Sequence, residues 1–197
     1  LKICLLSSCS NNIDCEVVTF HNKPLPKGET ISVKPINPAN IGSIQFKEYA
    51  RLVSENLLTI GYTPVKENEN SKLIAEIDYN ISAHRTRTIT TTEPYVLYHF
   101  SRGRYHRPYY YGYYSVVNSP YYRRYTETVY SRELIVNIVE AIGINTENRK
   151  VVFETSVSST GRENNLSEIM PYLVAAAFTN FPGESGIAKI ITIEKDH

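Results

Sequence analysis

Two segments with helical spacing of apolar residues, set among short β-branched runs, most strongly constrain how this chain can fold. One stripe follows Ser43, which can cap a helix, and stops before Gly61 and Pro64, which end it. It comprises Phe46, Ala50, Val53, Leu57 and Ile60. The other follows Asn165 or Ser167 as N-cap and comprises Ile169, Met170, Leu173, Val174, Ala177, Phe178 and Phe181. Each predicted helix has one apolar face, so each needs a partner surface.

Runs of alternating or β-branched residues predict the strands that supply this surface. They are residues 16–21, 30–36, 73–81 with a Thr-rich continuation at 86–92, 125–142, 151–157 and 187–193. The predicted order is therefore ββαβββαβ. Strands outnumber helices and neighbouring strands meander, so we expect an α+β fold with an antiparallel or mixed sheet and both helices on one face. A long Tyr-rich hairpin insertion interrupts the middle strands.

The cysteines exclude two other ways of stabilising the fold. Cys4, Cys9 and Cys15 all precede residue 16, so a disulfide framework and a zinc site of paired cysteines are both ruled out for the rest of the chain. A chain of 197 residues can form one core of ordinary size. The net charge of +1 gives no overall attraction to nucleic acid or an acidic membrane.

The N-terminal residues indicate export and lipidation. Lys2, apolar residues and small residues precede Cys9, which is the order of a secretory signal, although the apolar part is short. Leu6-Ser7-Ser8-Cys9 is similar to the bacterial lipobox, in which the cysteine receives a lipid and the preceding residues are removed. We expect residues 1–15 to be signal remnant, lipobox and tether, and 16–197 to be one domain. The alternative is a cytosolic protein with an apolar N-terminus and three ordinary thiols.

The segment 95–125 is the candidate contact surface. It lies in a stretch without Asp or Glu between Glu93 and Glu127, and its five arginines leave −4 for the rest of the chain. Tyrosine rings stack on sugars, and guanidinium groups fork onto phosphate or carboxylate. The candidate binding residues are Arg102, Arg104, Arg107, Tyr109, Tyr110, Tyr111, Tyr113, Tyr114, Tyr121, Tyr122, Arg123 and Arg124. They suit a glycan, an anionic envelope polymer or a protein partner, whereas export disfavours nucleic acid. Tyrosines packed on the sheet without a ligand, and self-association, stay open.

Residues that could carry catalysis or a metal are sparse. His84, His99 and His106 have no Cys or nearby carboxylate beside them, so we expect neither a metal site nor a cofactor. Gly183-Glu184-Ser185-Gly186 is one residue short of a nucleophile elbow and follows a helix instead of a strand, so it predicts a turn. The sequence therefore indicates a protein without enzymatic activity.

Several of these features together resemble a group of bacterial outer-membrane lipoproteins that contain a domain of unknown function. The resemblance is carried by the lipobox, Ile60-Gly61-Tyr62 after the first helix, the Tyr-rich insertion and the segment Phe181-Pro182-Gly183-Glu184-Ser185-Gly186. It implies a place in the cell envelope, at the outer membrane facing the periplasm, and brings no catalytic residues with it.

We therefore expect a lipid-anchored binding or scaffolding module whose partners are the membrane and a ligand of the insertion. Two alternatives remain: an envelope hydrolase with unrecognised catalytic residues, and a subunit of a larger envelope assembly.

Overall fold

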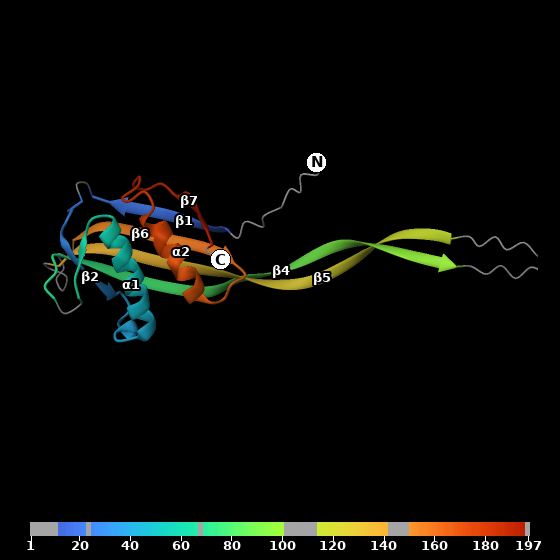
Figure 1. Cartoon of the computed structure of the whole chain (residues 1–197), viewed down its shortest axis with the longest axis horizontal. Helices are drawn as coiled ribbons and strands as arrows, with labels where there is room; N and C mark the ends of the chain where they lie inside the picture. The colour runs from blue at the N-terminus through green and yellow to red at the C-terminus, as the bar shows by residue number, and fades with distance from the viewer. Residues whose placement is uncertain (1–11, 23–24, 67–68, 101–113, 142–149, 196–197) are drawn as a thin grey trace, which may run out of the picture. The chain divides into compact units, whose positions relative to one another are not determined.

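The fold is a mixed α+β arrangement of one sheet and two helices (Figure 1). The computed structural model describes residues 12–22, 25–66, 69–100, 114–141 and 150–195. Its elements are β1 (Asn12–His21), β2 (Thr30–Pro35), the 3-10 helix η1 (Pro38–Asn40), α1 (Ile44–Thr59), β3 (Thr63–Pro64), β4 (Leu73–Phe100), β5 (Tyr114–Glu140), β6 (Val151–Gly161), α2 (Leu166–Phe178) and β7 (Lys189–Glu194). The predicted α+β class is confirmed. The predicted order lacks β3, a strand of two residues that is too short to show a periodicity.

The sheet is mixed and has the order β3-β2-β4-β5-β6-β1-β7. β2 runs parallel to β3 and to β4, and α1 lies on the connection between β2 and β4. β6 pairs antiparallel with β5 and with β1, and β1 pairs antiparallel with β7. β7 therefore occupies one edge of the sheet, where Ile190 is 76% exposed.

α1 begins and ends where the sequence predicts. The Ser43 hydroxyl accepts a hydrogen bond from the backbone N–H of Phe46 at 3.3 Å, which satisfies one free donor of the first turn. Gly61 adopts a φ of 97° just after the helix, a value that glycine reaches without strain. The buried residues of α1 are Phe46, Tyr49, Val53 and Leu57.

α2 is capped by Asn165, whose side-chain oxygen accepts from the backbone N–H of Ser167 at 3.1 Å. Pro171 lies within this helix. Most of the helix is apolar and buried, which offsets the hydrogen bond that a proline cannot donate.

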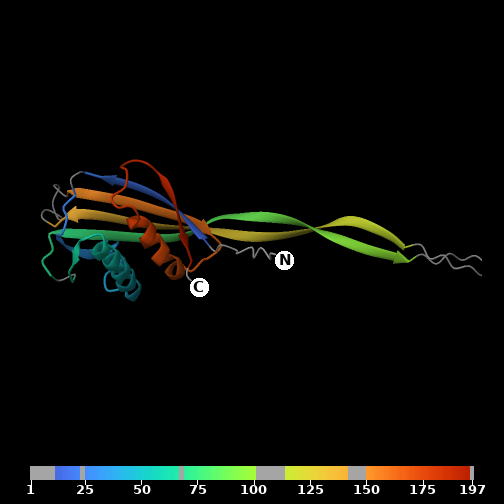
Figure 2. The same cartoon turned by 45° about the horizontal axis from the view of Figure 1, so that its top comes forward.

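Both helices lie on the same face of the sheet, as Figures 1 and 2 show. Strand side chains that point to this face are buried, among them Cys15 of β1 and Leu134, Val136 and Ile138 of β5. Tyr49 joins the layers: its hydroxyl is 2.9 Å from the Ser167 hydroxyl of α2, and its ring meets Tyr79 of β4 edge-on at 4.7 Å between ring centroids. The core thus forms between the two helices and one sheet face.

The chain divides into two compact units, and the predicted Tyr/Arg-rich insertion 95–125 belongs to the second of them. The first contains residues up to His84 and from Val129 onward, and the second is Arg85–Thr128. The strands are also longer than predicted, because β4 continues to Phe100 and β5 begins at Tyr114. β1 begins at Asn12, four residues before the predicted boundary, since Ile13 and Cys15 are in phase with the buried face of the strand.

The core location of the helices generates a stability prediction. Leu57 of α1 and Leu173 of α2 are both fully buried. Replacing either by alanine removes apolar contacts and leaves a cavity, so each change should lower the free energy of unfolding by about 2 to 5 kcal/mol. Urea denaturation measures this. Ile44→Ala is the matched control, because Ile44 is 85% exposed and should change stability by less than about 0.5 kcal/mol. Neutral effects at both leucines would contradict the assigned packing.

Candidate functional site

The predicted contact segment 95–125 lies only partly within the described chain. The lipidation candidate Cys9 and the candidates between residues 101 and 113 lie outside the described residues: Arg102, Arg104, Arg107, Tyr109, Tyr110, Tyr111 and Tyr113. Tyr114, Tyr121, Tyr122, Arg123 and Arg124 lie on β5, where the description of 114–123 covers the backbone alone. Arg124 is exposed, and the adjacent Tyr125 is 46% exposed.

The second unit, Arg85–Thr128, concentrates the positive charge of the chain. It contains seven arginines and two glutamates, a net charge of +5, which leaves −4 for the first unit. It also contains eleven of the 16 tyrosines. The parts of β4 and β5 within this unit provide extended backbone, on which successive side chains alternate between two faces. Such a composition can stack on sugar rings and can pair with anionic groups.

A second candidate site, which the sequence did not predict, centres on Arg132 of β5. Arg132 is 3% exposed, and it is in phase with the buried residues Leu134, Val136 and Ile138. Its Nη2 donates to the Ser159 hydroxyl over a long distance of 3.5 Å, and its buried Nε has no hydrogen-bond partner within the described chain. Burial lowers the pKa of the guanidinium, although nearby Glu163 and Cys15 act to raise it. A buried cation with an unused donor is energetically costly.

Gly161 makes room for this guanidinium. A Cβ at residue 161 would lie 2.5 Å from Arg132 Nη2, closer than real contacts allow. Arg132 stands opposite Ser159 in the register of β5 and β6, so its side chain reaches two residues along β6 to lie over Gly161. The backbone is therefore shaped to hold the arginine in this position.

A pocket of about 420 Å³ opens beside Arg132. Its lining includes cationic and anionic side chains and the apolar Ile13 and Ile169. The charged lining residues are Asp14, Arg132, Arg162, Glu163 and Lys195. All of them belong to the first unit. The pocket is thus a charged hollow with a buried arginine in its wall.

Cys15 lies in the core next to this cluster. It is fully buried and forms no disulfide. Burial raises the pKa of its thiol to about 11, against the opposing effects of Ser159 and Arg132. The sequence predicted that Cys15 belongs to the tether of residues 1–15. That placement is wrong, because Cys15 points to the helix-covered face of β1.

The alternation of β5 carries a signal for Arg132. From Leu134 to Ile138 every second residue is apolar and buried, and residue 132 continues the same face. A charged side chain in phase with a buried stripe indicates a partnered or functional charge. Gly161 is the last residue of β6.

The predicted turn after α2 contacts the end of β1. The backbone N–H of Gly186 donates to the Thr19 carbonyl at 2.8 Å, and the backbone N–H of His21 donates to the Ser185 hydroxyl at 3.3 Å. Ser185 and His21 also line a hollow of about 280 Å³. The Ser185 hydroxyl meets the backbone of His21, an arrangement that anchors a turn and does not activate a nucleophile.

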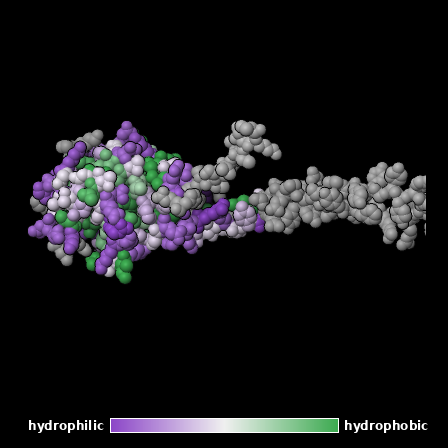
Figure 3. Space-filling model, viewed as in Figure 1, coloured by the Kyte–Doolittle hydropathy of each residue, from purple (hydrophilic) through white to green (hydrophobic). Residues whose placement is uncertain are grey.

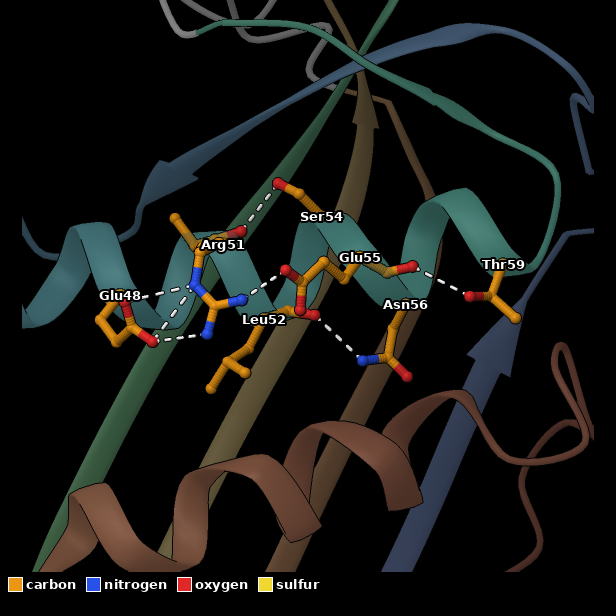
Figure 4. Close-up of polar contacts among 8 residues, drawn as sticks. Glu48, Arg51, Leu52, Ser54, Glu55, Asn56 and Thr59 are labelled. Atoms are coloured by element: carbon orange, nitrogen blue, oxygen red, sulfur yellow. Dashed lines mark hydrogen bonds and ion pairs between the residues drawn. The ribbon is translucent and has the colours of Figure 1, made fainter.

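The outer face of α1 carries exposed charges that pair along the helix. Figure 4 shows Arg51 between Glu48 and Glu55, with Nη2 2.6 Å from Glu48 Oε1 and a further ion pair to Glu55. Hydrogen bonds from Arg51 lower the pKa of Glu48. Ser54, Asn56 and Thr59 donate to helix carbonyls four residues earlier. These contacts stabilise the helix surface and gather no free functional group.

Hydrophobic and hydrophilic residues are interspersed on the face of the molecule seen in Figure 3. Within the described ranges, no three His, Cys, Asp or Glu side chains come together as metal ligands would. No helix in the same ranges is long and apolar enough to cross a membrane.

The buried thiol generates a pH prediction, best measured in a chain with Cys4→Ser and Cys9→Ser. With a pKa about two units above its ordinary value, Cys15 should react with iodoacetamide at pH 8 at least about a hundredfold more slowly than in urea. Because the folded state holds the thiol proton more tightly, stability should fall as pH rises from about 9 to about 11. Cys15→Val should remove this component of the fall. Equal labelling rates with and without urea would contradict the buried position.

Comparison with known proteins adds the family. The model of "Domain of unknown function (DUF4136)" matches residues 19–183. A PDZ domain protein from Parabacteroides distasonis is similar at 11% identity, with 93% of this chain and 39% of that chain covered and a TM-score of 0.49. This chain thus spans about two-fifths of that protein.

Two further solved structures are similar over 84% of this chain and 95% of their own chains. They are a DUF4136 family protein from Bacteroides thetaiotaomicron at 16% identity and TM-score 0.43, and a PelC dodecamer from Paraburkholderia phytofirmans at 9% and 0.40. These similarities are too low to bear on function. No curated protein matches the chain. The family model, which matches most of the chain, confirms the expected domain of unknown function, and the chain belongs to the DUF4136 family.

Proposed function

We propose that this protein is a non-enzymatic binding or scaffolding module of the bacterial cell envelope, anchored by a lipid on Cys9, whose contact surface is the Tyr/Arg-rich segment 95–125. The observation that carries the proposal is the division of the chain into two units. The unit Arg85–Thr128 holds the tyrosines and a charge of +5, while the core of buried residues is built from the first unit.

The lengths of the strands support a role beyond the core. Strands usually have 3 to 10 residues, and a hairpin needs only about 2 to 5 connecting residues. β4 and β5 have 28 and 27 residues. The core residues of β4 and β5 lie between Leu73 and Ile81 and between Arg132 and Val139. The remaining length adds no buried side chain among those described, and selection for recognition explains its composition better than selection for stability.

The chemistry favours an anionic glycan polymer of the envelope as the ligand. Tyrosine rings present flat apolar faces that match sugar rings, and the arginines supply charge for carboxylates along the polymer. Arg124 and Tyr125, the two residues of the segment whose side chains are described, are both exposed on β5. Peptidoglycan, with sugars and peptide carboxylates, is the corresponding probe.

Removing the segment should separate folding from binding. Replacing Tyr95–Arg124 by an Asn-Gly turn should leave the melting midpoint of the first unit nearly unchanged, because loop length changes closure entropy slowly. The same deletion should abolish co-sedimentation with purified peptidoglycan sacculi. An unfolded deletion variant would assign the tyrosines to stability, and a folded variant that still binds would place the contact surface elsewhere.

The arginines can be tested without the deletion. Arg123→Ala with Arg124→Ala should weaken binding to sacculi about fivefold and reduce its salt dependence, since two exposed charge pairs contribute on the order of 1 kcal/mol together. Lys47→Ala with Arg51→Ala removes the same charge from α1 and should leave binding unchanged. Equal losses in both double variants would indicate a response to net charge alone.

The anchor is tested at the N-terminus of the native protein. Mass spectrometry should find a diacylglyceryl group on Cys9 and no residues 1–8, and Cys9→Ser should release the protein from washed membranes. A native protein that retains Leu1 and carries no lipid would contradict the anchor, whatever the insertion binds.

A further inference from the structure

The Arg132 cluster has a donor without a partner at the wall of a pocket. Arg132 is 3% exposed, its Nε is unpaired, and its Nη2 makes one long bond of 3.5 Å to Ser159. The ion pairs formed between described residues do not include Arg132. Burying a cation that forms no ion pair is costly, so an anion in the pocket would relieve a cost that the fold otherwise bears.

The neighbouring oxygens already have other donors. Asp14 Oδ1 accepts from the Thr192 hydroxyl at 2.7 Å, and Glu163 Oε1 accepts from the backbone N–H of Asn165 at 3.1 Å. The Ser159 hydroxyl donates its proton to the Asp14 carbonyl at 2.8 Å. These contacts hold the acidic groups to β7 and to the start of α2, and no ion pair between described residues joins them to the Arg132 guanidinium in the pocket wall.

Size and charge narrow the class of ligand. A volume of about 420 Å³ lies in the range of small-molecule sites and exceeds the needs of a single ion. The charged lining residues sum to +1, from Arg132, Arg162 and Lys195 against Asp14 and Glu163. A ligand with a single negative charge balances the charge of this lining, whereas a phosphate dianion would exceed it by one charge. A guanidinium binds carboxylate oxygens through parallel hydrogen bonds.

We propose that this pocket binds a ligand of about amino-acid size that carries a carboxylate, with the Arg132 guanidinium as its anchor and Gly161 as the residue that admits the guanidinium. The site lies in the first unit and does not depend on the role of the insertion.

The test uses N-acetylglycine as a carboxylate probe and N-acetylglycinamide as its neutral isostere, at equal ionic strength with sodium chloride. N-acetylglycine at saturating concentration should raise the melting midpoint of the wild-type protein by about 5 °C and shift the NMR signal of the Arg132 Nε–H. The amide should do neither. No shift with N-acetylglycine, or an equal shift with inorganic phosphate, would overturn the proposal.

Arg132→Met should abolish the response while leaving the unliganded protein folded, because a buried unpaired charge can often be replaced by an apolar side chain without loss of stability. Arg51→Met is the matched control and should keep the full response, since Arg51 is exposed on α1 and does not line the pocket. Gly161→Ala keeps the charge but displaces the guanidinium, and should also lose the response. If Arg132→Met fails to fold, the proposal is tested by the response of Gly161→Ala and by the shift of the Arg132 Nε–H signal in the wild-type protein. A response retained in either pocket variant would overturn the assignment.

Discussion

Burial of the two helices against one sheet face is the interaction on which the rest of this structure depends. β1, β2, β4, β5 and β6 each contribute alternate residues to that face, and α1 and α2 contribute Leu57 and Leu173, both fully buried. Tyr49 adds hydrogen bonds to this apolar contact, because its hydroxyl lies 2.9 Å from both the Gln45 side-chain nitrogen and the Ser167 hydroxyl. Removing this layer would expose apolar surface on these five strands at once, so the sheet depends on the helices for its stability.

The same face explains what could be predicted from the sequence. The helices were predictable because an apolar stripe with a cap at Ser43 or Asn165 is a local signal. Tyr49 was missed because a tyrosine carries a polar hydroxyl and was not counted among the apolar residues of the helix. In the structure it is central, because its hydroxyl contacts Ser167 of α2 and its ring packs on Tyr79 of β4. The ends of β4 and β5 were missed because their Thr-rich and Tyr-rich parts lack apolar alternation, so pairing between the strands determines them.

The two candidate sites differ in whether the sequence alone reveals them. Composition alone reveals the Tyr/Arg-rich segment, since eleven tyrosines and no acid between Glu93 and Glu127 are visible without coordinates. The Arg132 pocket requires five distant stretches of chain, from Asn12 to Lys195, to come together. Only the register that places Arg132 opposite Ser159, and Gly161 under the guanidinium, turns these scattered residues into one site.

The position of β1 inside the sheet has a consequence for how the protein folds. This first strand lies between β6 and β7, and Val17 pairs with Val157 on one side and Lys189 on the other. The backbone groups of β1 must therefore wait for β6 and β7, which come much later in the chain, before they find partners. Contacts so far apart in sequence give a high contact order and slow folding. Until β6 and β7 have been synthesised, β1 lacks both of its strand partners and its apolar residues Ile13 and Val17 lack their core contacts, a state in which exposed strand edges favour aggregation.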